Sequence, residues 1–446
     1  MKNNIRINEL CYSTLSSDNP NSYETYIKQG GYSTWRKIIS NMSDRKEIIN
    51  TVIESGLRGR GGAGFSTGRK WSFINQDSDE IKYLVCNADE SEPGTCKDRD
   101  ILRYNPHALI EGMLIASYAI GAETAYCYLR GEFIGDVYSS FKNALEDAYS
   151  NKLIGKNILN TNTSIEIHDL IGAGAYIVGE ETAMLESIEG KKGFPRYKPP
   201  FPAVKGLFGN PTIINNVETL ASIPKIIYEG SDWFSSIGTD ESSGFKCFSV
   251  SGHVNKPGNY EIPLGTSFKT LLELAGGMKD GKKLKAVIPG GSSVPVVPGN
   301  IMMQTNMDYE SIEKAGSLLG SGAVIIMDES TNMVEVIHRI SRFYYSESCG
   351  QCTPCREGTG WMFRIIDKII KGKASIEDFK TLESIPRMIS GSTICALGDA
   401  AAMPVESFIK YYKSEFLKYI KVINKPKNEI LISNTDLKKE FVLHRK

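Results

Sequence analysis

The sequence predicts an α/β protein built from a mostly parallel sheet with helices on both faces, then a small α+β unit, then a helical bundle. Strand-like and helix-like segments alternate between residues 81 and 189, which is typical of parallel strands joined by crossover helices. Short strands between Gly/Pro turns occupy residues 245–330, and apolar residues at helical spacing dominate from Thr331 onward. Because 446 residues are too many for one hydrophobic core, several domains are expected.

Residues 1–55 are predicted to form an irregular N-terminal arm that leads into a helix near Arg45–Ser55. The first domain is expected over residues 56–244. Asn105 and Pro106 are expected to supply the N-cap and first-turn proline of its first long helix. Its predicted elements are strand Ile81–Cys86, helix Pro106–Ile120, strand Thr124–Leu129, helix Asp136–Tyr149, strand Ile165–His168, helix Glu180–Ile188 and a helix near Asn216–Tyr228.

The second domain is expected over residues 245–330 and the third over residues 331–424. The second has one clear helix, Thr270–Leu274, among strands Cys247–Val254, Gly258–Ile262, Ala286–Pro289 and Ala323–Met327. In the third, one helix presents the apolar face Val336, Ile337, Ile340, Phe343 and Tyr344, before helices Trp361–Ile370, Ile376–Ile389 and Ala400–Tyr419. Residues 425–446 are expected to be a polar tail.

The composition describes an ordinary globular chain, with 41% hydrophobic and 23% charged residues. Lys plus Arg and Asp plus Glu number 52 each, a balance that predicts no nucleic-acid partner. The sequence contains no run of about 20 apolar residues that would span a bilayer and no apolar signal peptide. We therefore expect a cytoplasmic protein whose nine cysteines are not a disulfide framework. Any association with a membrane would have to go through partner subunits.

A cysteine run is the strongest chemical signal in the sequence. Cys349, Cys352 and Cys355 follow one another at a spacing of three, and Cys395 lies forty residues further on. Gly350 suits the tight turn that three converging thiolates need, and four thiolates are the ligand set of a [4Fe–4S] cluster. Structural zinc, which usually takes two separate Cys-x-x-Cys pairs, in a non-catalytic scaffold is the alternative at this stage. Cys86, Cys127 and Cys247 are predicted to be buried apolar residues. Cys11 and Cys96 have no second cysteine at a spacing typical of a metal site.

Two glycine-rich segments are candidate nucleotide-binding loops. Gly59, Gly61 and Gly64 match G-x-G-x-x-G, but a helix-like segment precedes them, so they do not predict an ordinary Rossmann NAD site. Nearby arginines and Lys70 would attract a phosphate to exposed backbone amides; a solvated surface loop is the alternative. The second segment, residues 172–181, follows a predicted strand and opens a helix.

Polar side chains follow the first predicted strand on the side where ligands of open α/β sheets bind. Asn87, Asp89, Glu90 and Glu92 could bond a flavin edge or ribose hydroxyls, and they could equally form turns. The five histidines are scattered along the chain, and each is expected to be structural. The sequence shows no compelling Ser-His-Asp or Cys-His arrangement, so no catalytic triad is predicted.

Several blocks of this sequence closely resemble the NADH-binding flavoprotein (the F subunit) of respiratory complex I, NADH:quinone oxidoreductase. The resemblance runs from about Gly56 to Tyr419, with motifs of every domain in the family's order. The blocks are GLRGRGGAGFSTGRKW from Gly56, CNADESEPGTCKDRD from Cys86, GAGAYIVGEETAMLESIEG from Gly172, RYKPPFPA from Arg196, NNVETLA from Asn215, ESCGQCTPCREGT from Glu347 and STICALGDAA from Ser392.

The resemblance implies a Rossmann-like FMN domain, a ubiquitin-like β-grasp (SLBB) domain and a helical bundle that carries a [4Fe–4S] cluster. It implies FMN contacts from Gly59, Arg60, Gly61, Lys70, Asn87, Asp89, Ser91, Tyr176, Gly179, Asn215, Asn216 and Thr219. It implies NADH stacking by Phe65, Phe73 and Phe201, with polar contacts from Glu92, Glu180, Glu181 and Lys198. Gly62, Gly64, Glu90 and Ile214 complete the expected cofactor-binding positions, and Cys349, Cys352, Cys355 and Cys395 are the implied cluster ligands.

The activity implied by the resemblance is hydride transfer from NADH to FMN, followed by one-electron transfer to the cluster and on to partner subunits. The implied partners are a small thioredoxin-like [2Fe–2S] subunit and a large iron–sulfur subunit, at the cytoplasmic face of a bacterial inner membrane. The alternative within the same resemblance is a diaphorase subunit of a soluble NAD-linked hydrogenase or formate dehydrogenase.

Overall fold

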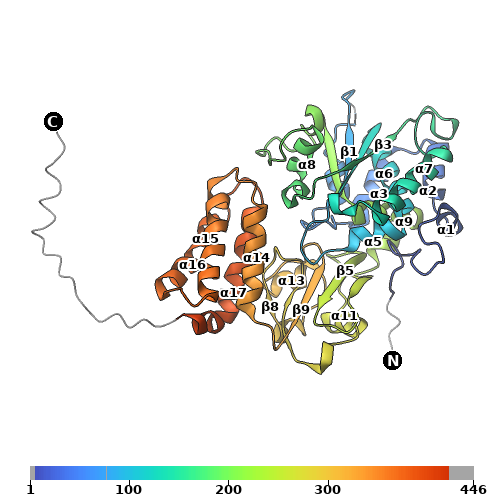
Figure 1. Ribbon diagram of the computed structural model, residues 1–446. Helices are drawn as coiled ribbons and strands as arrows, with labels where there is room; N and C mark the ends of the chain where they lie inside the picture. The colour runs from blue at the N-terminus through green and yellow to red at the C-terminus, as the bar shows by residue number, and fades with distance from the viewer. Residues whose placement is uncertain (1–5, 77, 421–446) are drawn as a thin grey trace, which may run out of the picture.

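The computed structural model describes residues 6–76 and 78–420. Figure 1 shows three units: a sheet with its helices, a second, mixed sheet below it, and a helical bundle to one side. The cofactor-binding candidates lie where these units meet, so their packing decides the site. The predicted polar tail, residues 425–446, and the last four residues of the predicted bundle lie outside the described residues.

The first sheet contains four parallel strands in the order β3-β2-β1-β4. Three of them confirm the strands predicted from the sequence: β1 (Tyr83–Ala88), β2 (Thr124–Leu129) and β3 (Glu166–Ile171). The fourth, β4 (Thr212–Asn216), is not predicted, because its apolar run is short and continues directly into a helix. Asn215 and Asn216 end this strand. The helix predicted near Asn216–Tyr228 follows directly, with Asn216 as its N-cap and Thr219 in its first turn.

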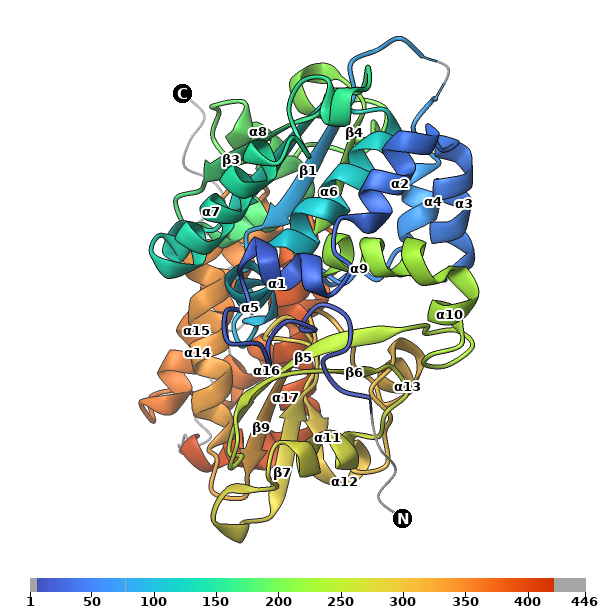
Figure 2. The same cartoon turned by 90° about the vertical axis from the view of Figure 1, so that its right-hand side faces the viewer.

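Helices cover both faces of this sheet, as the alternating pattern predicts (Figure 2). Leu84 and Cys86 of β1 pack with α6 (Pro106–Ile120) and α9 (Val217–Glu229), whereas Val85 packs with α8 (Glu181–Ile188) on the opposite face. The helices α6 and α9 touch closely: a Cβ on Gly112 would lie 1.9 Å from the Leu220 carbonyl oxygen. The remaining helices of this domain are α3 (Arg45–Glu54), α4 (Thr67–Trp71), α5 (Lys97–Tyr104), α7 (Asp136–Ser150) and α10 (Ser231–Ser235).

The N-terminal arm is not irregular: it contains α1 (Tyr23–Lys28) and α2 (Ser33–Asn41). Tyr32 and Trp35 are completely buried in the core of the first domain. Their backbone amides donate to the carboxylate of Glu111 on α6, at 2.7 and 3.0 Å. Short helices with strong tertiary anchors escape prediction because their stability comes from packing rather than from local propensity.

Asn105 precedes α6 as predicted, but its side chain does not cap the helix. Its amide Nδ2 instead donates to the Cys11 carbonyl oxygen at 3.0 Å. Asn105 is therefore the N-cap residue, with Pro106 in the first turn as predicted, but its side chain binds the N-terminal arm instead of the helix.

The second domain is a five-stranded mixed sheet in the order β6-β5-β9-β7-β8, with β5 and β9 parallel. The small α+β unit predicted for this region is confirmed. Its elements are β5 (Phe245–Gly252), β6 (Gly258–Pro263), α11 (Phe268–Leu274), β7 (Leu284–Ile288), β8 (Val297–Pro298), α12 (Gly299–Met302), α13 (Tyr309–Lys314) and β9 (Ala323–Asp328). The short elements β8, α12 and α13 are not predicted by the sequence.

The third unit is the predicted helical bundle, formed by α14 (Met333–Glu347), α15 (Thr353–Ile370), α16 (Ile376–Ile389) and α17 (Leu397–Tyr419). Ile337, Ile340 and Tyr344 of the predicted apolar face are buried in it. Tyr344 also stacks edge-on against Tyr176, which follows β3 in the first domain. The bundle therefore packs directly onto the edge of the first domain where the strands end.

Candidate nucleotide cavity and cysteine pocket

The glycine-rich loop connects α3 to α4, so a helix precedes it, as the sequence predicts. The loop closes on itself where the Gly59 amide donates to the Phe65 carbonyl oxygen at 2.8 Å. Gly64 has a φ of +65°, in the left-handed region that favours glycine. A Cβ on Gly61 would lie 3.0 Å from Cβ of Asn216, so the absence of a side chain lets the loop approach the end of β4.

Three further segments meet this loop at the carboxyl ends of the parallel strands. Asn87 and Asp89 lie at the end of β1, Asn216 ends β4, and Tyr176–Gly179 follows β3. The Asn87 side chain joins two of these segments, because its Nδ2 donates to the Gly179 carbonyl oxygen at 2.9 Å. The sequence expectation that these side chains share one edge of the sheet is therefore correct.

Two adjoining cavities open at this edge, with volumes of about 920 and 400 Å³. Gly61, Gly62, Asn87, Glu180 and Asn216 line both of them. The larger is also lined by Gly59, Gly64, Phe65, Lys70, Phe73, Glu181, Lys198, Phe201, Ile214, Asn215 and Thr219. The smaller is also lined by Asp89, Glu90, Ser91, Glu92, Tyr176 and Gly179. Clefts of roughly 300–1,000 Å³ are typical of small-molecule and cofactor sites.

Arg60 is the predicted cofactor-binding residue that lines neither cavity. Its side chain is buried and reaches the segment just before β5, where Nη2 donates to the Ser243 carbonyl oxygen at 2.8 Å. Arg58 is also engaged elsewhere, in an ion pair with Glu310. The positive charge inside the larger cavity therefore comes from lysines rather than from these arginines.

Those lysines are Lys70 and Lys198, and both pair with Glu181. The Lys70 ammonium lies 3.2 Å from one Glu181 oxygen and donates to the Ile214 carbonyl oxygen at 2.8 Å. The Lys198 ammonium lies 2.7 Å from the other Glu181 oxygen and 3.0 Å from Glu180. Burial alone would raise the pKa of Glu181, but the two ammonium groups outweigh it and lower that pKa. The cavity thus has an ionised carboxylate and two cations on one wall.

The smaller cavity is lined by two acids, Asp89 and Glu90, whose pKa values are raised by burial. Burial raises the pKa of Asp89 to about 7, and neither of its carboxylate oxygens has a hydrogen-bond partner. Glu90 also has a pKa raised to about 7 by burial and by Asp98, although it accepts hydrogen bonds from two amides at the start of α5. Buried polar atoms without partners are rare in folded proteins, so Asp89 is suited to accept hydrogen bonds from a bound polar ligand.

Glu92, predicted to contact NADH, is engaged by the protein itself. It accepts hydrogen bonds from the Tyr176 hydroxyl at 2.7 Å and from the Ser293 amide of the second domain at 2.8 Å. Ser293, Val294, Leu318, Gly320 and Ser321 of this domain also line the smaller cavity. No local motif identifies these residues, because they reach the cavity only through the packing of one domain on another.

Three exposed aromatic side chains border the larger cavity. Phe65, Phe73 and Phe201 are 52%, 58% and 57% exposed, and the rings of Phe65 and Phe73 lie 6.1 Å apart at a tilt of 42°. Large apolar rings that face solvent beside a cavity are suited to stack on a planar ligand. This arrangement agrees with the stacking role that the family resemblance implies for them.

The four predicted ligand cysteines line one small pocket. Cys349 and Cys352 lie between α14 and α15, Cys355 lies in the first turn of α15, and Cys395 precedes α17. The other lining residues are Ile177, Pro195, Ser348, Gln351, Ile394 and Leu397. Four sulfurs in an apolar setting without carboxylate or imidazole fit an iron–sulfur cluster. Burial raises the pKa of Cys395 to about 12 and that of Cys355 to about 11, so these thiols need a metal to become thiolates.

Cys395 connects the two sites, because it lines both the cysteine pocket and the smaller cavity. Ile177, which follows β3, also lines both. A single layer of side chains therefore separates the nucleotide cavity from the cysteine pocket.

The remaining cysteines and histidines lie apart from this chemistry. Cys86, Cys127 and Cys247 are completely buried, as predicted. The sequence shows no partner for Cys11, but the fold brings its sulfur within 4.8 Å of Cys247 and Glu261 ligand atoms. No described histidine lines either cavity or the cysteine pocket.

Family comparisons agree with this arrangement. Residues 52–225 match the Nuo51 FMN-binding domain, residues 247–297 the SLBB domain, and residues 335–419 the NADH-ubiquinone oxidoreductase-F iron-sulfur binding region. The last match identifies the metal group as a 4Fe–4S cluster, so the zinc alternative is not supported. Among the described helices, none combines the length and apolar character needed to cross a bilayer.

Individual relatives give the same result. The F subunit of NADH-quinone oxidoreductase in Rickettsia bellii (strain OSU 85-389) is 52% identical over 406 residues, or 91% of this chain and 97% of the relative. Its counterpart in Rickettsia felis is 52% identical over 92% of this chain and 97% of its own. A crystal structure of NAD+-reducing [NiFe]-hydrogenase in the H2-reduced state superposes with a TM-score of 0.77 at 34% identity, over 85% of this chain and 63% of that chain. The glycine loop, the strand-end cavity and the four-cysteine bundle thus belong to a member of the F-subunit family of NADH-quinone oxidoreductases.

Proposed function

We propose that the joined cavities bind FMN and NADH side by side. FMN would lie between the glycine loop and the strand ends, near Lys70, Asn87, Asp89 and Asn216. The nicotinamide nucleotide would lie at the open side, on the Phe65, Phe73 and Phe201 rings. When bound, FMN supplies a centre that accepts a hydride and returns the electrons one at a time.

The cluster ligands in this proposal are Cys349, Cys352, Cys355 and Cys395. The observation that carries the proposal is the position of Cys395, which lines both the cysteine pocket and the cavity at the strand ends. A ligand shared in this way keeps the two cofactors within one wall of each other, which favours electron transfer between them within a single chain.

The chain's own groups hold the nucleotides and keep water out. The Lys70 ammonium, fixed by Glu181 and the Ile214 carbonyl, presents positive charge to the electron-rich side of a bound ligand. The two carboxylate oxygens of Asp89 have no protein donor and would accept hydrogen bonds from the bound ligand. Glu92 and Tyr176 close the inner end of the cavity through their 2.7 Å hydrogen bond. None of these groups needs to transfer a proton for the hydride step.

Partners are implied by the family, because its members are named as one component of an NADH-quinone oxidoreductase. We infer that the neighbours are a small thioredoxin-like [2Fe–2S] subunit and a large iron–sulfur subunit, at the cytoplasmic face of the membrane. Trp361 and Met388 on the bundle are 49% and 64% exposed, and exposed apolar side chains of this size suit contact with another subunit.

A diaphorase role in a soluble hydrogenase is the second candidate, favoured by the structural likeness to NAD+-reducing [NiFe]-hydrogenase. Sequence identity favours the first candidate, because this chain is 34% identical to that enzyme and 52% identical to the quinone-oxidoreductase relatives. Copurification with a nickel-containing subunit would support the second candidate, and copurification with quinone-reductase subunits would support the first.

The direct test is absorbance and metal analysis of the anaerobically purified chain, before and after NADH. We expect about four irons per chain and a flavin band that NADH bleaches and NADPH does not. A colourless protein, or one that holds zinc instead of iron, would overturn the proposal.

A further inference from the structure

Lys246 lies on β5 of the second domain, and its side chain is completely buried. Its ammonium lies within hydrogen-bonding distance of four oxygens: Glu218 Oε2 at 2.8 Å, the Ser321 carbonyl at 3.0 Å, the Arg60 carbonyl at 3.3 Å and the Cys247 carbonyl at 3.4 Å. A buried ammonium has a high desolvation cost and stays charged only where oxygens surround it. Such a group therefore fixes the positions of the segments that supply those oxygens.

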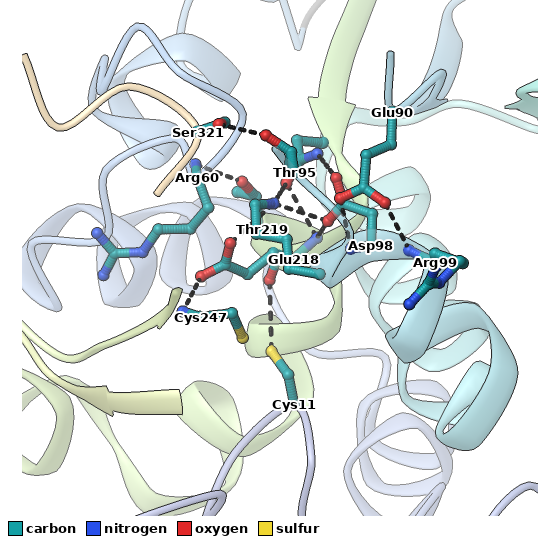
Figure 3. Close-up of polar contacts among 12 residues, drawn as sticks. Cys11, Arg60, Glu90, Thr95, Asp98, Arg99, Glu218, Thr219, Cys247 and Ser321 are labelled. Atoms are coloured by element: carbon teal, nitrogen blue, oxygen red, sulfur yellow. Dashed lines mark hydrogen bonds and ion pairs between the residues drawn. The ribbon is translucent and has the colours of Figure 1, made fainter. Parts of the chain in front are cut away.

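Those segments come from two domains. Arg60 belongs to the glycine loop, Glu218 to the first turn of α9, and Ser321 to the turn before β9. Figure 3 shows Glu218 lying among Arg60, Thr219 and Cys247, with Ser321 beyond Arg60. Thr219 strengthens the link, because its hydroxyl oxygen accepts the Arg60 amide at 2.8 Å. One ammonium thus holds the glycine loop both directly and through α9.

A second buried lysine completes the charge balance. Lys97 Nζ lies 2.8 Å from both Glu218 Oε2 and Asp98 Oδ1. Asp98 in turn accepts the Asn216 side-chain amide at 2.7 Å. Burial alone would raise the pKa of Glu218, but Lys246, Lys97 and Arg60 outweigh it and hold that pKa at about 2. Glu218 is therefore an ionised centre for both lysines.

Each segment held by Lys246 also lines the proposed FMN site. Gly61 follows Arg60, Thr219 follows Glu218, and Ser321 itself faces the smaller cavity. We propose that Lys246 is a positioning residue: its buried ammonium holds the glycine loop, the start of α9 and the Gly320–Ser321 turn in the geometry that binds FMN. The SLBB domain is then part of the flavin site rather than only a connection to the bundle. This inference rests on the proposed location of FMN.

The test compares Lys246→Met with Lys285→Met in chains depleted of flavin but retaining the cluster. Lys285 is a matched control, because it lies on β7 of the same sheet and joins it to α17 through Glu415 at 2.7 Å, away from the cavities. We expect K246M to weaken FMN binding by at least about tenfold and to change the visible circular dichroism of FMN at saturation, while K285M changes neither. The cluster EPR signal, unchanged in both, reports that the chain is folded.

Removing one member of a buried ion pair can prevent folding, so the double variant K246M/E218Q is the second arm. It removes the charges of Lys246 and Glu218 together and leaves Lys97 paired with Asp98. The Arg60 and Ser321 carbonyls still lose their donor. Weakened FMN binding in this variant supports the inference, and wild-type affinity and dichroism overturn it. Lys70→Met separates the two proposals: if K70M weakens FMN binding and the Lys246 variants do not, only this inference fails. If neither variant weakens binding, the FMN location itself is wrong.

Discussion

The cysteine pocket and the nucleotide cavity differ in how much of the chain builds them. The pocket takes all four sulfurs from residues 349–395 of one bundle: three at or just before the start of α15 and one just before α17. The cavity takes its walls from the glycine loop, the ends of β1 and β4, the segment after β3, two loops of the second domain and the start of α17 in the bundle. A single substitution of a ligand cysteine should therefore abolish cluster binding. Single substitutions in the cavity should weaken nucleotide binding to different degrees.

The largest effect is expected from removing one sulfur. Cys352→Ser leaves three thiolates where a [4Fe–4S] cluster needs four, so the cluster EPR signal should disappear while FMN remains bound. Cys96→Ser, at a cysteine outside the pocket, is the control and should retain the signal. A normal cluster spectrum in C352S would contradict the ligand assignment.

A smaller loss, of FMN affinity, is expected when the larger cavity loses the Lys70 ammonium. Lys70→Met removes a charged hydrogen-bond donor, which corresponds to about a 10- to 100-fold weaker FMN affinity, measured by flavin fluorescence on titration. The neighbouring Arg69→Met is the control, since Arg69 is exposed and lines neither cavity. Equal affinities in the two variants would contradict the position proposed for FMN.

The aromatic border should affect NADH rather than FMN. Phe201→Ala removes one stacking surface and should raise the KM for NADH by roughly tenfold, with FMN affinity unchanged. Tyr197→Ala is a close control, because Tyr197 is 72% exposed and outside the cavity. If F201A instead released FMN, the assigned order of the two ligands along the cavity would be reversed.

The smallest effect is a pH dependence of stability. The pKa of Asp89 in the folded chain is about 7, above its ordinary value of 3.8, so between these values the folded state binds more protons than the unfolded state. Stability conferred by protonated Asp89 is therefore lost as pH rises through 7, by about 1.4 kcal/mol between pH 6 and pH 8.

Urea unfolding of the flavin-free chain measures this dependence. Asp89→Asn should reduce it by the share of Asp89 and leave the share of Glu90, whose pKa is also about 7. The exposed Asp136→Asn should not change it, because the pKa of Asp136 is lowered by Arg103 and lies below this range. The same slope in wild type and D89N would show that Asp89 does not contribute to the dependence.

The same contrast explains what could be predicted from the sequence. Three of the ligand cysteines and the turn glycine Gly350 lie within residues 349–355, so their spacing alone predicts a metal site. Cys395, forty residues further on, completes the set of four sulfurs. Most of the cavity was also accessible, because Asn87, Tyr176 and Lys70 lie in segments that the family resemblance identifies. Strand β4 and the helices α1 and α2 were not accessible, since short elements depend on tertiary packing. Lys246 and Ser321 carry no local signal, because they act across a domain boundary.

The central claim is that one chain holds FMN and the cluster close enough for direct electron transfer. Rapid-freeze EPR of the isolated chain after anaerobic mixing with NADH tests it most directly. The account predicts a reduced-cluster signal that appears with NADH when FMN is bound and is absent in flavin-depleted chain. If NADH bleached the flavin while a cluster reducible by dithionite stayed silent, the two sites would not communicate and the account would be contradicted.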